Sequence, residues 1–200
     1  MKYKNLTVSQ KGLSLIESAM VLAISAVIVS GVLYYYNHAQ ENRKLEEGIK
    51  QIQTIATSVN KLYTNSVTPP RGDNDTVEAI SVISGIPTVI GPDQAKMFST
   101  PSGQWVQFWV NNNSSVSNTY SLEAQVQSVS SCISYATLNM GTIMAAKTQV
   151  LTDSTNHVNN GNSNSSTNFS LSPSVASDAC EKAGKRKNGN NIKIRYTLSY

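Results

Sequence analysis

One carboxylate stands alone in the most apolar part of this sequence. Glu17 is the only charged residue between Leu13 and Tyr36, in a run of aliphatic, small and aromatic residues. Insertion of an acid near the centre of a hydrophobic helix costs roughly 2.5–3.5 kcal/mol, and such residues usually have a partner and a function. Cleavage between Gly12 and Leu13 would create an α-amino group, a cation that Glu17 of a neighbouring chain can bind. The predicted chemistry is an ion pair between chains, and self-assembly is its natural use.

A second interpretation of Glu17 needs no partner chain. Ser14-x-x-Glu17 has the spacing of a capping box, in which the serine accepts from the amide three residues on and the glutamate side chain reaches back. The helix macrodipole also favours an acid in the first turn. Capping alone does not remove the cost of placing Glu17 in an apolar segment, so both uses of this residue stay open.

The two cysteines suggest a second covalent feature. Lys2, Lys4 and Lys11 precede the apolar run and no acid does, so the positive-inside rule keeps the N-terminus in the cytoplasm and sends the remainder outward. Cys132 and Cys180 therefore lie in an oxidising compartment, where a disulfide is the default. The three leader lysines also account for most of the formal charge of +4.

No residues with the spacing of a catalytic or metal site are found. His38 and His157 are far apart, and neither belongs to a set of zinc ligands. The sequence has no phosphate-binding loop, nucleophile elbow or dinucleotide glycine pattern. We expect no enzyme activity, no metal and no cofactor.

Two surface motifs are explained by local structure. Arg71-Gly72-Asp73 matches a tripeptide read by some adhesion receptors, but a turn accounts for Gly72 and Asp73 equally well. The basic cluster Lys182, Lys185, Arg186 and Lys187 could contact phosphates. A solvated helix end is the simpler interpretation, so no nucleic-acid partner is expected.

A membrane-spanning helix must position Glu17. About 20 apolar residues cross a bilayer, and Leu13 to Tyr36 is long enough. The run exceeds the apolar part of a secretory signal and no Ala-x-Ala cleavage site follows it, so the helix is predicted to be retained. Tyr34, Tyr35 and Tyr36 lie where an interfacial aromatic belt is expected.

The helical pattern continues beyond the apolar run. Apolar residues recur every three or four positions from Leu45 to Tyr63, and no proline occurs before Pro69. One helix from about Ser14 to about Tyr63 is predicted, with its upper half packed on a globular head. Ser30-Gly31 is the position at which a gentle bend or local melting is expected.

The remaining sequence predicts a head with both helices and strands. Period-2 patterns, caps and turn residues predict these elements. The expected helices are Thr76–Ser84, Ser131–Met140 and Pro173–Gly184; the expected strands are Gln104–Val110, Thr119–Gln127 and Asn191–Tyr200; the expected loops are Asn65–Asp75, Gly85–Pro92, Asn111–Asn118 and Asp153–Ser172. The first two strands are expected to form a hairpin.

At its N-terminus the sequence resembles a known family. Gly12 followed by Leu13-Ser14-Leu15-Ile16-Glu17-Ser18-Ala19-Met20-Val21-Leu22-Ala23 is similar to the class III leader and first helix of type IV prepilins. The resemblance implies that a prepilin peptidase cuts after Gly12, that the new N-terminus Leu13 is methylated, and that Glu17 pairs with the amine of another subunit. An aliphatic first residue in place of phenylalanine is similar to the type IVb branch, and the run that begins at Cys132 resembles pilins of that branch.

The resemblance also implies an organisation of the chain. A leader peptide would occupy 1–12, and the N-terminal helix 13–64, with 13–36 in the membrane or the filament core. The head, 65–200, would have the α+β type IV pilin fold. In that fold an antiparallel sheet lies on the long helix, and a disulfide between Cys132 and Cys180 bounds the segment 132–180, called the D-region.

The implied function is that of a structural subunit of a type IVb pilus, for adhesion and bundling. The partners would be copies of the chain in a helical filament, a prepilin peptidase, the pilus assembly machinery of the inner membrane, the membrane itself before assembly, and a host-cell surface. The head would be periplasmic before assembly and extracellular afterwards, in a Gram-negative bacterium. The alternatives are a minor pilin or a type II secretion pseudopilin, and a membrane-anchored binding or sensor protein that does not polymerise.

Overall fold

The computed structural model describes residues 14–66, 68–110, 118–152, 169–186 and 192–200. The chain divides after Asn42 into two compact units, and each is described by itself. Helix α1 (Leu15–Tyr63) begins in the first unit and ends in the second. Its bounds confirm the predicted continuous helix.

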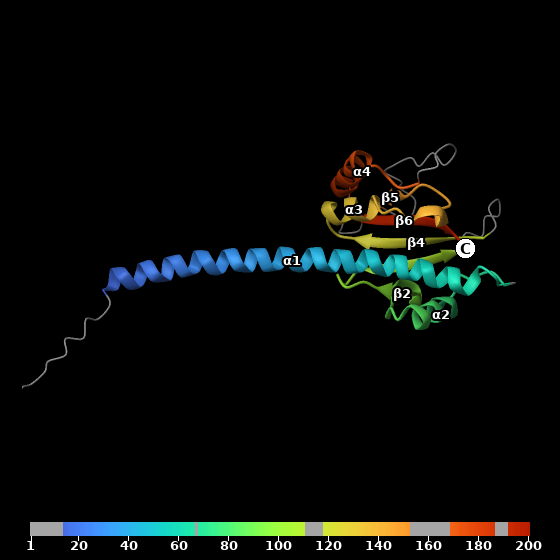
Figure 1. Ribbon diagram of the computed structural model, residues 1–200, viewed down its shortest axis with the longest axis horizontal. Helices are drawn as coiled ribbons and strands as arrows, with labels where there is room; N and C mark the ends of the chain where they lie inside the picture. Colours follow the sequence, from blue (N-terminus) through green and yellow to red (C-terminus); the bar gives the residue numbers. More distant parts are fainter. Residues whose placement is uncertain (1–13, 67, 111–117, 153–168, 187–191) are drawn as a thin grey trace, which may run out of the picture. The chain divides into compact units, whose positions relative to one another are not determined.

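The second unit, Arg43–Tyr200, contains the later part of α1 and the head, and it is built on one antiparallel sheet (Figure 1). The strands are β1 (Thr88–Ile90), β2 (Lys96–Ser99), β3 (Trp105–Val110), β4 (Thr119–Val126), β5 (Gln149–Leu151) and β6 (Ile192–Ser199). They lie in the order β1-β2-β3-β4-β6-β5, with every neighbouring pair antiparallel. The C-terminal strand β6 is therefore inside the sheet, between β4 and β5. The predicted pairing of the second strand with the first is confirmed by β3 and β4.

Alternation of apolar side chains in the two longest strands creates the core. Leu122 lies opposite Tyr196 and Ala124 opposite Ile194, so the apolar positions of β4 and β6 share one face of the sheet. The part of α1 after Asn42 packs on this face with an apolar stripe that is fully buried. The residues of that stripe are Ile52, Ile55, Ala56 and Val59. Each fully buried aliphatic side chain contributes about 1.5–3 kcal/mol, so this contact is a main source of the stability of the head.

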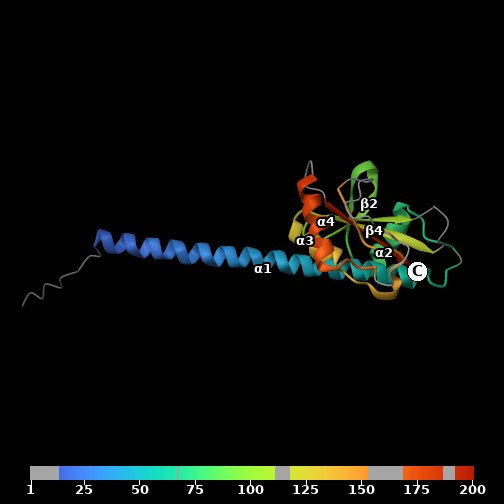
Figure 2. The same ribbon diagram turned by 90° about the horizontal axis from the view of Figure 1, so that it is seen from above.

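Three shorter helices complete the head. Helix α2 (Asn74–Ser84) lies beside β2, and α3 (Val129–Ala136) lies beside α4 (Pro173–Arg186) at the β6 side of the sheet (Figures 1 and 2). Asp73 caps α2 by accepting a hydrogen bond from the Thr76 amide, and Gly85 ends it in the left-handed conformation. Short 3-10 turns occur at Pro92–Gln94 and Gly141–Ile143.

Several predicted elements and boundaries are wrong. Helix α2 begins at Asn74 instead of Thr76, because Asp73 is its cap. The expected loop Gly85–Pro92 contains the edge strand β1, which is only three residues long and lies between Pro87 and Gly91-Pro92. Helix α3 begins at Val129 instead of Ser131, because Ser128 caps it by accepting from the Ser131 amide, and it ends at Ala136.

Helix α4 continues through Gly184 to Arg186 instead of stopping at the glycine. A Cβ at Gly184 would lie 2.9 Å from Cγ2 of Val129 in α3, so close packing between α3 and α4 explains this glycine. The predicted turn Asn111–Asn118, apart from its last residue, and most of the predicted loop Asp153–Ser172 lie outside the described residues.

Candidate functional site

The first unit presents an apolar helix with exposed side chains. Its large apolar side chains are 55–90% exposed between Leu15 and Leu33. By length and composition α1 can cross a membrane, and its most apolar window has no buried residue. In a soluble environment such a surface would bind another apolar surface. The helix is therefore suited to lipid, to other helices, or to each in turn.

Glu17 lies in the first turn of this helix, and its side chain is exposed. The Oγ of Ser14 accepts from the Ile16 amide at 3.3 Å, and not from the amide of Glu17. Among the residues that the structure describes, the Glu17 carboxylate takes part in no hydrogen bond or ion pair. The reciprocal capping box is therefore not formed within 14–66, and the carboxylate is accessible to a group from outside the helix.

The serines of the apolar run are satisfied inside the helix. The hydroxyls of Ser18, Ser25 and Ser30 donate to the carbonyls of the residues four positions earlier, at 3.2, 2.7 and 2.7 Å. Hydroxyls bonded in this way carry little cost in hydrocarbon, where water cannot replace a missing partner. Glu17 is thus the one strongly polar group that the described apolar run leaves without a partner.

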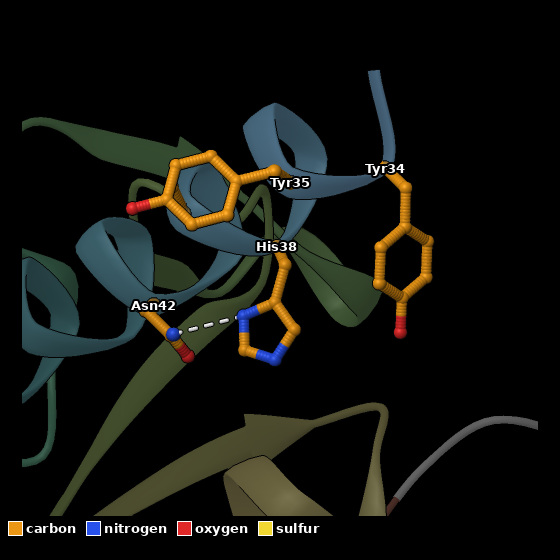
Figure 3. A pocket seen from close by; sticks show the side chains of 5 residues that line it. Tyr34, Tyr35, His38 and Asn42 are labelled. Atoms are coloured by element: carbon orange, nitrogen blue, oxygen red, sulfur yellow. Dashed lines mark hydrogen bonds between the residues drawn. The ribbon is translucent and has the colours of Figure 1, made fainter. Parts of the chain in front are cut away.

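A notch on α1 follows the apolar run. It has a volume of about 360 Å³ and is lined by Tyr34, Tyr35, His38, Ala39 and Asn42, all in the first unit. In Figure 3 the imidazole of His38 lies below the two phenol rings, and its Nδ1 is 3.0 Å from Nδ2 of Asn42. The sequence predicted the tyrosines as an interfacial belt but gave no sign of this notch, which depends on their rotamers.

In the head, the disulfide lies at the contact between α3 and α4. Cys132 of α3 and Cys180 of α4 are bonded, with their Cα atoms 5.8 Å apart, and both are fully buried. The bond closes a loop with a sequence separation of 48. In the chain-entropy model such a loop stabilises the fold by about 4 kcal/mol. The disulfide expected in the fold is thus present, and it holds the segment 132–180 at both ends.

A buried ion cluster on the sheet was not found from the sequence. Glu123 of β4 is 1% exposed and pairs with two cations of β6, Lys193 at 2.9 Å and Arg195 at 2.7 Å. The Lys193 ammonium also lies 5.1 Å from the centre of the Trp105 ring. Both strands were predicted with these residues at their polar positions, so the missing information was only that β4 and β6 are neighbours.

Buried tyrosines link α1, the sheet and α3. The Tyr196 hydroxyl donates to the backbone carbonyl of Tyr135 at 2.6 Å, and the Tyr120 hydroxyl donates to the carbonyl of Ala56 at 3.4 Å. Burial raises the pKa of Tyr135 to about 12 and raises the pKa values of Tyr120 and Tyr196 further above the ordinary value of 10. These tyrosines act as neutral structural groups.

The two surface motifs have structural roles where they are described. Asp73 is the cap of α2, and hydrogen bonds from Thr76 lower the pKa of its carboxyl. Lys182 pairs with Asp178 one turn earlier in α4 at 2.6 Å, and Lys185 and Arg186 lie in the last turn. Asp73 is thus a helix cap where a turn was predicted, and the cations Lys185 and Arg186 lie at a helix end as predicted.

Several predicted residues cannot be placed. Gly12, Leu13, His157 and Lys187 lie outside the described residues. Among the residues that the structure describes, no group of His, Cys, Asp or Glu is arranged to hold a metal ion. The candidate site is therefore the exposed face of α1 between Glu17 and Asn42.

The chain is similar to known pilus proteins. The sequence model of the bundlin family matches residues 37–199. Two relatives, each named the major structural subunit of the bundle-forming pilus, come from Escherichia coli O111:H- and from Escherichia coli O127:H6 (strain E2348/69 / EPEC). Each is 30% identical over 174 residues, which cover 86% of this chain and 88% of the relative.

A solved structure shows the same fold. The type IVb pilin from Salmonella typhi matches with a TM-score of 0.52 and 12% identity, over 76% of this chain and 97% of the pilin. The long helix, the antiparallel sheet and the Cys132–Cys180 disulfide agree with that likeness. This chain therefore belongs to the bundlin family and has the type IVb pilin fold.

Proposed function

We propose that this chain is the major structural subunit of a type IVb pilus and assembles into filaments through α1. The observation that carries the proposal is the exposed apolar run of α1, in which the Glu17 carboxylate has no partner among the residues that the structure describes. The relatives of this chain are named structural subunits of a bundle-forming pilus. Transfer of this helix from lipid to protein surroundings leaves its apolar surface covered. Glu17 then forms an ion pair with a cation of a neighbouring copy. Bundling of filaments and attachment to cells are functions of the exposed heads.

The proposed maturation creates the partner of Glu17. A prepilin peptidase cuts between Gly12 and Leu13, and the new N-terminal amine of Leu13 is methylated and keeps its positive charge. The leader is then 1–12, the assembly helix 13–64 with 13–36 in the membrane or the filament core, and the head 65–200. The accessible Glu17 side chain and its lack of a bond to Ser14 support this assignment.

The same proposal assigns partners and location. Before assembly the subunit lies in the inner membrane of a Gram-negative cell with its head in the periplasm. The pilus assembly machinery then moves it into an extracellular filament. The buried disulfide and the membrane-length helix support this route. Host-cell surfaces are the proposed targets of the finished filament. We assign the chain no enzymatic role.

Substitution of Glu17 tests the assembly mechanism. In cells that process the leader normally, Glu17→Ala is expected to remove filaments from the sheared surface fraction while the membrane-bound subunit remains at the wild-type level. Glu17→Gln keeps the shape and removes the charge, so it should fail in the same way if the ion pair is required. Glu181→Ala removes an exposed carboxylate of the head and should leave assembly unchanged. Wild-type filament yield from Glu17→Ala would refute the pairing.

Two further measurements separate this proposal from its alternatives. Mass spectrometry of the sheared filaments should find a methylated Leu13 as the N-terminal residue. If the wild-type chain were absent from those filaments but abundant in the membrane, it would be an anchored protein that does not polymerise. If it were present only in trace amounts, it would be a minor pilin or a pseudopilin.

A further inference from the structure

Strand β1 has a free edge. It is the first strand in the sheet order, and among the strands that the structure describes it pairs with β2 alone. The carbonyl of Pro87 accepts from β2 at 2.9 Å, and the amide of Gly91 donates to the turn before β2 at 2.8 Å. Because the bonded residues alternate in an antiparallel ladder, the N–H and C=O groups of Thr88 and Ile90 point away from β2. These groups have no hydrogen-bond partner within the described ranges.

Apolar side chains surround this edge. Ile90 is 75% exposed, and Val89, on the opposite face of the strand, is 42% exposed. Helix α2 contacts β1 and β2 at this end of the sheet (Figure 1), and its Val82 is 78% exposed. Val82 lies one turn after Glu78, whose carboxylate pairs with Lys96, the cross-strand neighbour of Ile90. The two charges beside Ile90 thus neutralise each other, and the exposed surface between them and the edge is apolar. Exposed apolar surface of this kind marks a contact site.

A second copy of β1, running antiparallel, fits the edge. Thr88 then lies opposite Ile90 of the second copy, and Ile90 lies opposite its Thr88. Each of these pairs exchanges two hydrogen bonds, so every outward backbone group of the strand finds a partner. Val89 faces Val89 of the second copy as a non-hydrogen-bonded pair, in which side chains approach most closely. Pro87 and Pro92 end the strand on either side. The edge is therefore complementary to itself about a two-fold axis at Val89.

A two-fold contact cannot join neighbours within one pilus filament. Subunits of a helical filament are related by a rotation with a translation and all point the same way, so their contacts are heterologous. A self-complementary edge therefore joins copies that belong to two different filaments. A second copy is also the occupant that the charges allow, since Glu78 and Lys96 are already paired and present no net charge that would repel the same surface.

We propose that the β1 edge, formed by Thr88, Val89 and Ile90 with Val82 beside them, is the surface through which filaments of this chain bundle. The inference rests on the proposed function and deepens it, because it names the surface that joins one filament to the next. Three strand residues a side are far fewer than the roughly 20–30 of a stable protein interface. Single subunits therefore bind weakly through this edge, and the contact gains strength by repetition along two filaments.

A charge exchange at Val89 tests the two-fold contact. Val89→Lys brings two ammonium groups opposite each other, and Val89→Glu brings two carboxylates together, so each variant should lower the bundled fraction in low-speed sedimentation at least tenfold. The yield of sheared filaments should stay at the wild-type level. Mixing the two kinds of filament pairs opposite charges and should restore bundles to within twofold of the wild type. The matched control is Val175→Lys in α4, a valine of similar exposure, 45%, which should change bundling less than twofold.

The outcomes separate this inference from the proposed function. Wild-type bundling by Val89→Lys filaments, an equal loss from Val175→Lys, or a mixture that stays dispersed would overturn the two-fold contact. Loss of the filaments themselves in Val89→Lys, at equal membrane levels of subunit, would place the edge inside a filament and would also overturn it. In each of these cases the assembly of the wild-type chain stands. Absence of the wild-type chain from sheared filaments would instead overturn the proposed function.

Discussion

Gly48 of α1 leaves room for the side chain of Tyr135 in α3. It is buried on the head-facing side of α1, and a Cβ at this position would lie 2.1 Å from the hydroxyl oxygen of Tyr135. The next nearest atom, Cζ of the same ring, would be 3.4 Å away, an ordinary contact. A tyrosine that is 4% exposed cannot easily move its rigid ring. We therefore predict that Gly48→Ala destabilises the head, and that the hydroxyl alone is responsible.

The magnitude follows from two opposing effects. Overpacking a core costs about 1–3 kcal/mol. Alanine in place of glycine in a helix offsets about 0.8–1.0 kcal/mol of this. Gly48→Ala should therefore lower the free energy of unfolding by up to about 2 kcal/mol. In a Tyr135→Phe background the clash is absent, and the same substitution should raise the free energy by about 1 kcal/mol. The sign of the effect should thus reverse.

Urea unfolding of the purified full-length protein in mild detergent measures all four members of this cycle. The fluorescence of Trp105 and Trp109, the only two tryptophans, reports on strand β3. Thermal midpoints should shift by about 2–4 °C per kcal/mol for a domain of this size. If Gly48→Ala had the same effect with and without the Tyr135 hydroxyl, the proposed clash would be wrong.

Three further predictions concern the head. Glu123→Gln leaves Lys193 and Arg195 without their carboxylate and should lower the free energy of unfolding by about 1.5–3 kcal/mol. The control Glu181→Gln, at the exposed surface, should change this free energy little. Equal urea midpoints for the two variants would contradict the prediction. Cys132→Ser with Cys180→Ser should cost about 4 kcal/mol, and reductant should lower the midpoint of the wild type but not that of the double variant. Burial raises the pKa of Tyr135 to about 12, above its unfolded value of 10, so above pH 10 the folded head retains a proton that the unfolded chain loses. The free energy of unfolding should therefore be constant below pH 10 and decrease as the pH rises above it. Urea midpoints between pH 8 and 11 would show this decrease, which should be smaller in Tyr135→Phe.

Long periodic segments could be predicted from the sequence. The apolar run and the stripe beyond it gave α1 to within a residue at each end, and the alternation in the last strand gave β6. These patterns extend over several turns or several pairs, so chance matches are rare. The charge rule and the two cysteines likewise led to the disulfide that the head contains.

Short elements could not be predicted because their cause is not local. Strands β1 and β5 have three residues each, too few for a pattern, and they exist because β2 and β6 offer them partners. The Glu123 cluster required the sheet order, which connects residues 72 positions apart. The notch at His38 required side-chain rotamers. In each case the missing information was tertiary.

The place of β6 in the sheet has a consequence for how the head is made. Strand β6 lies between β4 and β5, so the sheet lacks an interior strand until residues 192–199 are in place. A chain that ends before Ile192 lacks both the neighbour of β5 and the cations that pair with Glu123. A subunit truncated before Ile192 therefore exposes unpaired strand edges, which can pair with other chains.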